Sequence, residues 1–154
     1  MPKIITVYLS GPMYLGKEQA MGWRNDVKRY IRDWEVFLPG LSPRPPATFN
    51  VIDPCDRWLD KGGPLENEGP FVVQMDKMEI AKSDVLIVNA TNPGWGTPME
   101  QFLGWQSGKL VIAFCECDYP SIWATIHSHK MCKTHMDAAK FLCEVAARQL
   151  ARVV

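Results

Sequence analysis

The chain of 154 residues carries seventeen basic and seventeen acidic residues, so its formal net charge is zero, and 47% of its residues are hydrophobic. This composition is typical of one globular domain over residues 1–154, without a basic run of the kind that binds nucleic acid or an anionic membrane. The apolar run near the N-terminus is too short to span a membrane and lacks a small-residue cleavage site. We therefore expect a cytoplasmic protein that binds neither nucleic acid nor membranes.

Apolar runs of strand type alternate with segments of helical periodicity along the chain. Strands are expected at 4–9, 35–40, 50–54, 85–88 and 109–116, and helices at 19–33, 71–83, 97–108 and 135–154. The segment 54–70, which proline and glycine interrupt, is expected to be a long loop. The alternation predicts an α/β fold, a single-domain parallel sheet with helices on both faces, flavodoxin-like or Rossmann-like. Ligands of such sheets bind beyond the carboxyl ends of the strands.

The cysteines and histidines raise two questions. The five cysteines are odd in number and show no disulfide-framework spacing, which favours reduced thiols. The segment 127–135, HSHKMCKTH, holds three histidines and a cysteine, which are zinc-type ligands. Neither C-x-x-C nor H-E-x-x-H is present, however, so histidines at the surface or at a subunit contact are the commoner interpretation, and no metal is expected.

The loop after the first strand resembles a phosphate-binding loop only superficially. Residues 11–18, GPMYLGKE, fit the pattern G-x-x-x-x-G-K between a strand and a helix. The next position is Glu18, where magnesium binding needs Ser or Thr, and a carboxylate there would repel phosphates. A later strand ends in Asn89, where a metal-binding Asp is required. The P-loop interpretation is therefore set aside, although the SGP turn could present backbone N–H groups to a small anion or a sugar.

Two carboxylates flank the expected strand at 85–88. Asp76 lies on the helix before it and Glu100 on the helix after it, each beside apolar residues. Glu100 falls about one turn into a helix that starts at Thr97, as N-cap or first-turn residue, where the macrodipole favours an ionised carboxylate. Such a group is a good nucleophile, and a second carboxyl nearby can act as an acid. From the spacing alone, Asp76 could instead face solvent and Glu100 could simply support its helix.

The order of the motifs YLSGP, DKMEIAKSDVLIVN and GTPME with GWQSGK resembles the nucleoside 2-deoxyribosyltransferase family. It also resembles the related 2'-deoxynucleoside 5'-monophosphate and cytidylate N-hydrolases, and the likeness covers residues 4–114. It implies that Glu100 attacks C1' of the nucleoside and forms a covalent deoxyribosyl ester. Asp76 would bind the sugar and help to protonate the departing base, and Tyr8 would orient the nucleophile. Without the resemblance, Tyr8 could equally be a core aromatic. No cofactor is implied.

The resemblance also assigns substrate-binding positions. Gly11, Gly96 and Thr97 match loop positions at which the backbone approaches the sugar. The transferases carry an Asp shortly before the nucleophile that reads the base, whereas this loop offers Asn89 and Asn92. An amide is both donor and acceptor, so it can read a base, but the preferred base stays open.

The choice between nucleoside and nucleotide depends on the first loop and on the IDPCDRW segment. The monophosphate hydrolases bind phosphate through Ser-x-Arg, but residues 12–14 here are Pro-Met-Tyr, with Lys17 as the nearest cation. This favours a nucleoside, although Arg57 could supply charge. Asp53 and Arg57 are therefore candidates for specificity, or they form only a surface ion pair.

Family members complete each active site with a residue of a neighbouring subunit, which implies a homo-oligomer. The corresponding segment here is 119–130, YPSIWATIHSHK, in which Ser121, His127 and Ser128 are plausible donors. Trp105 and Trp123 would then be interface or core residues.

We expect cleavage of the N-glycosidic bond of 2'-deoxynucleosides and transfer of the sugar to an acceptor base. The alternative within the enzyme class is an N-hydrolase acting on nucleosides or their 5'-monophosphates. A binding or sensing module without turnover is a third possibility, but binding alone needs no nucleophile.

Overall fold

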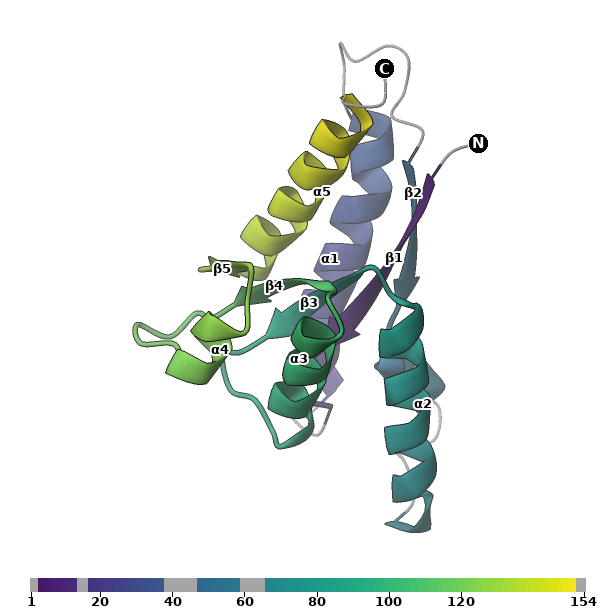
Figure 1. Cartoon of the computed structure of the whole chain (residues 1–154), viewed down its shortest axis with the longest axis vertical. Coiled ribbons are helices and arrows are strands. Elements are labelled where there is room, and N and C mark those ends of the chain that lie inside the picture. The colour runs from purple at the N-terminus through teal and green to yellow at the C-terminus, as the bar shows by residue number, and fades with distance from the viewer. Residues whose placement is uncertain (1–2, 14–16, 38–46, 59–65, 152–154) are drawn as a thin grey trace.

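The computed structural model describes residues 3–13, 17–37, 47–58 and 66–151. Its centre is a five-stranded parallel sheet of order β2-β1-β3-β4-β5 (Figure 1). The strands are β1 (Lys3–Ser10), β2 (Ala47–Ile52), β3 (Val85–Asn89), β4 (Leu110–Phe114) and β5 (Lys130–Cys132). This is the flavodoxin-like strand order, so the predicted α/β fold is confirmed.

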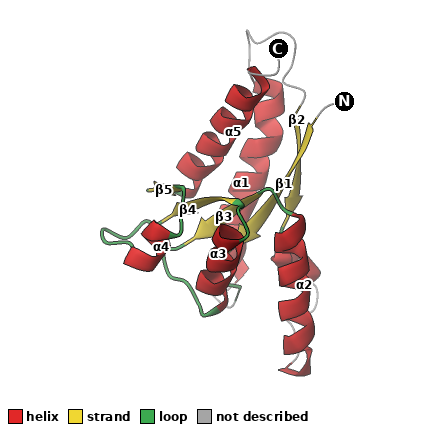
Figure 2. Ribbon diagram, viewed as in Figure 1, coloured by secondary structure: helices red, strands yellow, loops and turns green. Residues whose placement is uncertain are grey.

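Helices cover both faces of the sheet (Figure 2). The α-helices are α1 (Lys17–Phe37), α2 (Gly69–Lys82), α3 (Gly96–Gln106), α4 (Ile122–Ile126) and α5 (His135–Ala151). Short 3-10 turns η1 (Pro54–Arg57) and η3 (Glu66–Glu68) precede α2. Helices α1 and α5 pack together on one face, whereas α2 and α3 lie together on the other.

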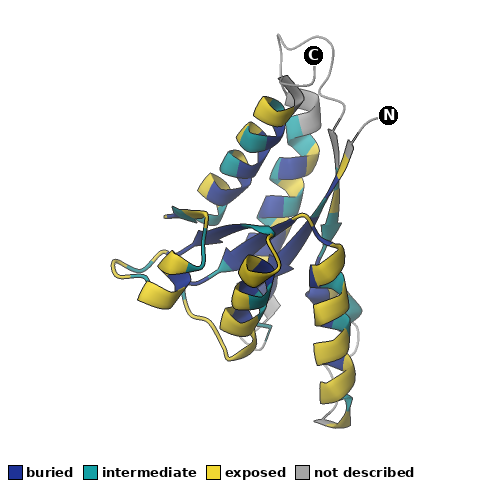
Figure 3. Cartoon of the chain, in the orientation of Figure 1, coloured by how far each residue is buried: buried dark blue, intermediate teal, exposed yellow. Residues whose placement is uncertain are grey.

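The alternation of side chains along β1 divides the core into two layers. Val7 and Leu9 pack in the layer beneath α1 and α5, whereas Tyr8 packs in the opposite layer with Leu86 and Ile80. Successive side chains of a strand point to opposite faces, so each strand serves both layers. The buried residues accordingly follow the sheet and the inner faces of the helices (Figure 3).

The structure corrects the predicted elements in two places. The strand expected at 35–40 is wrong for residues 35–37, which form the last turn of α1, and residues 38–40 lie outside the described residues. The helix continues because its apolar face extends to Trp34, whose ring packs 5.8 Å from that of Phe49. The strand expected at 50–54 corresponds to β2, which pairs with β1 but begins at Ala47 and ends at Ile52. The second correction concerns α4 and β5, which were not expected and are too short to give a periodic signal.

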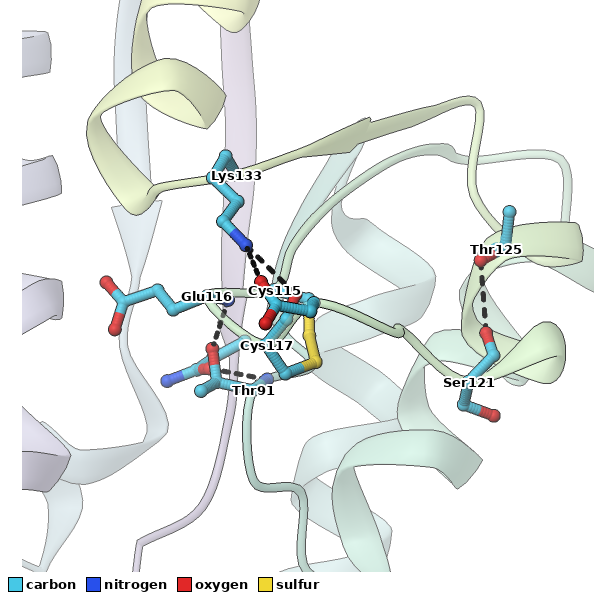
Figure 4. Close-up of a disulfide and its surroundings, with 9 residues drawn as sticks. Thr91, Cys115, Glu116, Cys117, Ser121, Thr125 and Lys133 are labelled. Atoms are coloured by element: carbon cyan, nitrogen blue, oxygen red, sulfur yellow. Dashed lines mark hydrogen bonds and ion pairs between the residues drawn. A yellow bond between two sulfur atoms is a disulfide. The ribbon is translucent and has the colours of Figure 1, made fainter.

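The expectation of reduced thiols is wrong for Cys115 and Cys117, which form a disulfide just after β4 (Figure 4). The chain turns there so that the two Cα atoms are 5.3 Å apart, a separation that a disulfide can bridge. Thr91 accepts a hydrogen bond from the backbone N–H of Glu116, and Lys133 donates to the carbonyl of Cys117. The sequence spacing alone gives no hint of this turn. The other three cysteines that the structure describes, Cys55, Cys132 and Cys143, are buried and lie outside this disulfide.

Within the described ranges, no helix has both the length and the apolar character that crossing a membrane requires.

Candidate active site

The candidate site lies at the carboxyl ends of β1 and β3. In the order β2-β1-β3-β4-β5 these two strands are the point at which the chain switches sides, and ligands of open parallel sheets bind in the crevice there. Tyr8 and Ser10 come from the end of β1, and Glu100 comes from α3, which follows β3. The fold therefore brings these distant segments together.

Both carboxylate oxygens of Glu100 accept a hydrogen bond from a hydroxyl group of β1. The Tyr8 hydroxyl donates to Oε1 at 3.3 Å, and the Ser10 hydroxyl donates to Oε2. Tyr8 and Ser10 are two residues apart and fully buried, so they share one face of the strand. Tyr8 is thus both a core aromatic and a hydrogen-bond donor to Glu100.

Glu100 is not held in the ionised form that its place in the helix suggested. Burial raises the pKa of Glu100 to about 7, and the negative charge of Asp76 acts in the same direction. The hydrogen bonds from Ser10 and Tyr8 oppose this shift without cancelling it. Desolvation therefore outweighs the macrodipole, and near pH 7 the protonated and ionised forms are both populated.

Asp76, on α2, lies close enough to Glu100 for its charge to act on that carboxyl group. Its carboxylate forms an ion pair with Nη2 of Arg57, while Nη1 of Arg57 pairs with Glu79 one turn further along α2. Burial raises the pKa of Asp76, and the guanidinium limits that rise. The alternative in which Asp76 faces solvent is excluded, because its side chain is only 12% exposed.

Arg24 fixes the loop that follows β1. This fully buried side chain donates from Nη2 to the carbonyl of Gly11 at 2.8 Å and from Nη1 to the carbonyl of Ala20 at 2.5 Å. Its Nε lies 3.2 Å from Oδ1 of Asp53, whose Oδ2 lies 2.5 Å from Nζ of Lys28. The alternative of a surface ion pair between Asp53 and Arg57 is therefore wrong, because each has other partners.

The predicted loop positions lie in different surroundings: Gly11 is closely packed, Asn89 and Asn92 line a cavity, and Gly96 is open. A Cβ on Gly11 would lie 2.8 Å from the Trp23 ring and 3.1 Å from Cβ of Asn89, so the backbone here passes too close for a side chain. Asn89 and Asn92 line a cavity of about 450 Å³ together with Trp23, on the α1 and α5 face of the sheet. At Gly96 the space is open, with no described atom within 4 Å of a Cβ. The two asparagines thus lie on the side of the sheet away from Glu100.

Thr97 and Ser128 lie together near the contact between α3 and α4. Thr97 is buried in the first turn of α3 and lines a cavity of about 160 Å³ with Ser121. The Ser128 hydroxyl donates to the carbonyl of Ala124 at 2.6 Å and accepts from Nε2 of Gln101 at 2.9 Å. In this chain Ser128 therefore joins α4 to α3.

The histidines make separate contacts. His127 stacks on Trp123, His129 accepts a hydrogen bond from the backbone of Val111, and His135 pairs with Asp26. In the ranges that the structure covers, no group of three or more His, Cys, Asp or Glu side chains is arranged to hold a metal ion.

Comparisons with known proteins agree with this arrangement at the level of fold. No family model matches the sequence, and no curated protein matches it. Among solved structures, a conserved protein from Enterococcus faecalis V583 has a TM-score of 0.68 at 12% identity over 96% of this chain and 99% of that one. A 2-deoxyribosyltransferase from Bacillus psychrosaccharolyticus has a TM-score of 0.62 at 19% identity, over 87% and 90% of the two chains. The Clostridium botulinum CMP N-glycosidase BcmB has a TM-score of 0.52 at 15% identity, over 89% of this chain and 97% of that one.

The chain shares the fold of this deoxyribosyltransferase. Within that fold, sequence reasoning missed two residues that hold the site together, Ser10 and Arg24. Ser10 could have been found from its position two residues after Tyr8, which places both on one strand face. Arg24 falls on the apolar stripe of α1 with Val27 and Ile31, where a charged residue requires a buried partner.

Proposed function

We propose that this chain cleaves the N-glycosidic bond of 2'-deoxynucleosides and transfers the deoxyribosyl group through Glu100 to an acceptor base. The observation that carries the proposal is the carboxylate of Glu100, held by Tyr8 and Ser10 at the switch point with a second carboxyl, Asp76, nearby. A ligand-binding pocket alone has no need of a partly buried carboxylate with a raised pKa. The deoxyribosyltransferase of the same fold supports the assignment of reaction class.

The proposed chemistry has two steps. Ionised Glu100 attacks C1', the bond from C1' to the base nitrogen breaks, and its electron pair leaves with the base, which takes up a proton. The transition state resembles an oxocarbenium ion, which the carboxylate of Glu100 stabilises. Burial raises the pKa of Asp76, which makes it a suitable proton donor, while Arg57 keeps it in place. In the second step a ring nitrogen of an acceptor base bonds to C1', the ester bond breaks, its electron pair returns to Glu100, and the proton of that nitrogen passes to Asp76.

Hydrolysis is the second candidate function, because the CMP N-glycosidase shares the fold. The two activities differ only in whether a base or water attacks the ester. Arg57 is already paired with Asp76 and Glu79, and these two carboxylates offset its positive charge. Arg57 therefore attracts a 5'-phosphate less, which favours a nucleoside as the substrate. A sensing module without turnover is the non-enzymatic alternative.

We also propose that the protein is a homo-oligomer whose subunits meet through α3 and α4. Large apolar side chains are exposed on and beside these helices: Trp95, Met99, Phe102, Trp105, Ile122, Trp123 and Ile126. Trp95 is 91% and Trp123 73% exposed, which is costly unless a partner covers them. Ser121 lies at the start of α4, within reach of such a partner. Trp105 and Trp123 belong to this exposed set and are thus suited to an interface.

The deciding experiment incubates the protein with each deoxynucleoside and each 5'-monophosphate, with and without a second base, and separates the products by chromatography. A new nucleoside identifies a transferase, and free deoxyribose identifies a hydrolase. Absence of both products, with tight binding of nucleosides, would support the sensing module instead. Asp76→Asn should slow the release of poor leaving groups most, and an equal effect on all bases would contradict an acid role.

A further inference from the structure

Ser10 occupies an unusual position for a serine. It is the last residue of β1, its side chain is fully buried, and its hydroxyl donates to Oε2 of Glu100. Within the part of the chain that the structure describes, this hydroxyl makes no other hydrogen bond. Glu100, in contrast, is only partly buried. A substrate in the crevice can therefore touch Glu100 but not Ser10.

The two oxygens of Glu100 are held differently. The bond from Tyr8 to Oε1 is long, at 3.3 Å, compared with about 2.7–2.8 Å for a typical bond between hydroxyl and oxygen. Oε1 is thus loosely held and keeps a lone pair for attack. Oε2 accepts the hydrogen bond from Ser10.

We propose that Ser10 is a positioning residue that holds Oε2 of Glu100, so that Oε1 attacks C1', and that stabilises the carboxylate when the sugar leaves. This inference rests on the proposed function. In the first step Oε1 bonds to C1', the base leaves with the electron pair of the broken bond, and Oε2 becomes the carbonyl oxygen of the ester. In the second step the acceptor bonds to C1' and loses its proton to Asp76, and the electron pair of the C1'–Oε1 bond returns to the carboxylate. Its charge is shared with Oε2, where the Ser10 hydroxyl stabilises it.

The charged surroundings of Glu100 are consistent with this role. Asp76 on α2 disfavours the ionised form, whereas Arg24 on α1 favours it, and the Tyr8 hydroxyl on β1 also favours it. Burial is the largest influence and raises the pKa of Glu100, and among the interactions that lower this pKa the bond from Ser10 is the largest. Ser10 thus helps to keep a fraction of this partly buried nucleophile ionised near neutral pH.

The test measures the Glu100 carboxyl directly, without substrate. Protein labelled with 13C at the glutamate side-chain carboxyl is titrated by NMR, and the Glu100 signal is identified by its loss in Glu100→Gln. Ser10→Ala should raise the pKa of Glu100 by about one unit or more, because a hydrogen bond to a charged group is lost. Tyr8→Phe, which removes the hydroxyl from the other oxygen, should raise it less. Thermal unfolding of both variants checks that the fold is kept. An unchanged pKa in Ser10→Ala would overturn the proposal.

Rapid-quench kinetics with a deoxynucleoside then separates the two steps. Ser10→Ala should slow release of the sugar from Glu100 more than its formation, so that mass spectrometry detects more of the covalent ester than in the unmodified protein. Equal slowing of both steps would overturn the stabilising role in the second step. If the unmodified protein cleaves no N-glycosidic bond, the proposed function fails and the kinetic part fails with it, while the titration still decides whether Ser10 controls the ionisation of Glu100.

Discussion

The hydroxyl of Tyr8 lies 3.3 Å from Oε1 of Glu100, which joins the first strand of the sheet to the helix after the third strand. The two strands are neighbours in the sheet, with Tyr8 opposite Leu86. The hydrogen bond is therefore a direct consequence of the strand order, and it places the carboxylate where parallel sheets bind ligands.

Replacing Glu100 with Gln should abolish sugar transfer and hydrolysis, because an amide is too weak a nucleophile to form the ester. We expect a loss of about 1,000-fold or more in the rate of base release, measured by chromatography. Glu144→Gln, on the exposed side of α5, is the matched control and should keep full activity. Activity of Glu100→Gln near that of the control would contradict the mechanism.

The same variant should be more stable than the unmodified protein at alkaline pH. Burial raises the pKa of Glu100 from 4.5 to about 7, so the unfolded chain loses this proton at lower pH than the folded chain, and stability falls between these values. Gln carries no charge at any pH. Denaturant unfolding should show a free-energy gain for Glu100→Gln of about 2–3 kcal/mol at pH 8 and little gain at pH 4.5. A gain that is equal at both pH values would contradict a raised pKa of the Glu100 carboxyl.

Replacing Arg57 with Met should destabilise the crevice, since Asp76 and Glu79 would lose their shared cation. These side chains are partly buried, so we expect the free energy of unfolding to fall by about 2 kcal/mol or more, together with a further rise in the pKa of Asp76. Arg29→Met is the control, because Arg29 is 63% exposed and its ion pair should contribute less than about 0.5 kcal/mol. Similar effects of the two substitutions on denaturant unfolding would mean that the Arg57 bridge contributes little.

Replacing Trp123 with Glu should weaken assembly, because it places a charge in the apolar surface of α3 and α4. Sedimentation equilibrium should show a shift toward monomers, and Lys77→Glu on the exposed face of α2 should leave the assembly state unchanged. If a neighbouring subunit completes the site, activity should fall with dilution of the Trp123 variant. A monomeric unmodified protein with full activity would exclude this interface.

Local patterns in the sequence determined the main elements of the fold. The β-branched runs that became β1, β3 and β4 and the periodic segments that became α2, α3 and α5 are signals of short range, and their alternation requires a parallel sheet. At 35–37 the local pattern was misleading, because packing of Trp34 against Phe49 extends α1. Elements as short as α4 and β5 carry no periodicity, since their stability comes from neighbours.

The motif order pointed to Tyr8, Asp76 and Glu100, but only the tertiary structure decided how they are charged and paired. The ionisation of Glu100 depends on burial and on groups distant in sequence, so the helix position alone gave the wrong direction. The same holds for Arg57, which pairs with Asp76 and Glu79, and for Asp53, which pairs with Arg24. The sequence determined which residues are present near the crevice, and the fold determined their contacts, because desolvation and ion pairing depend on distances in space.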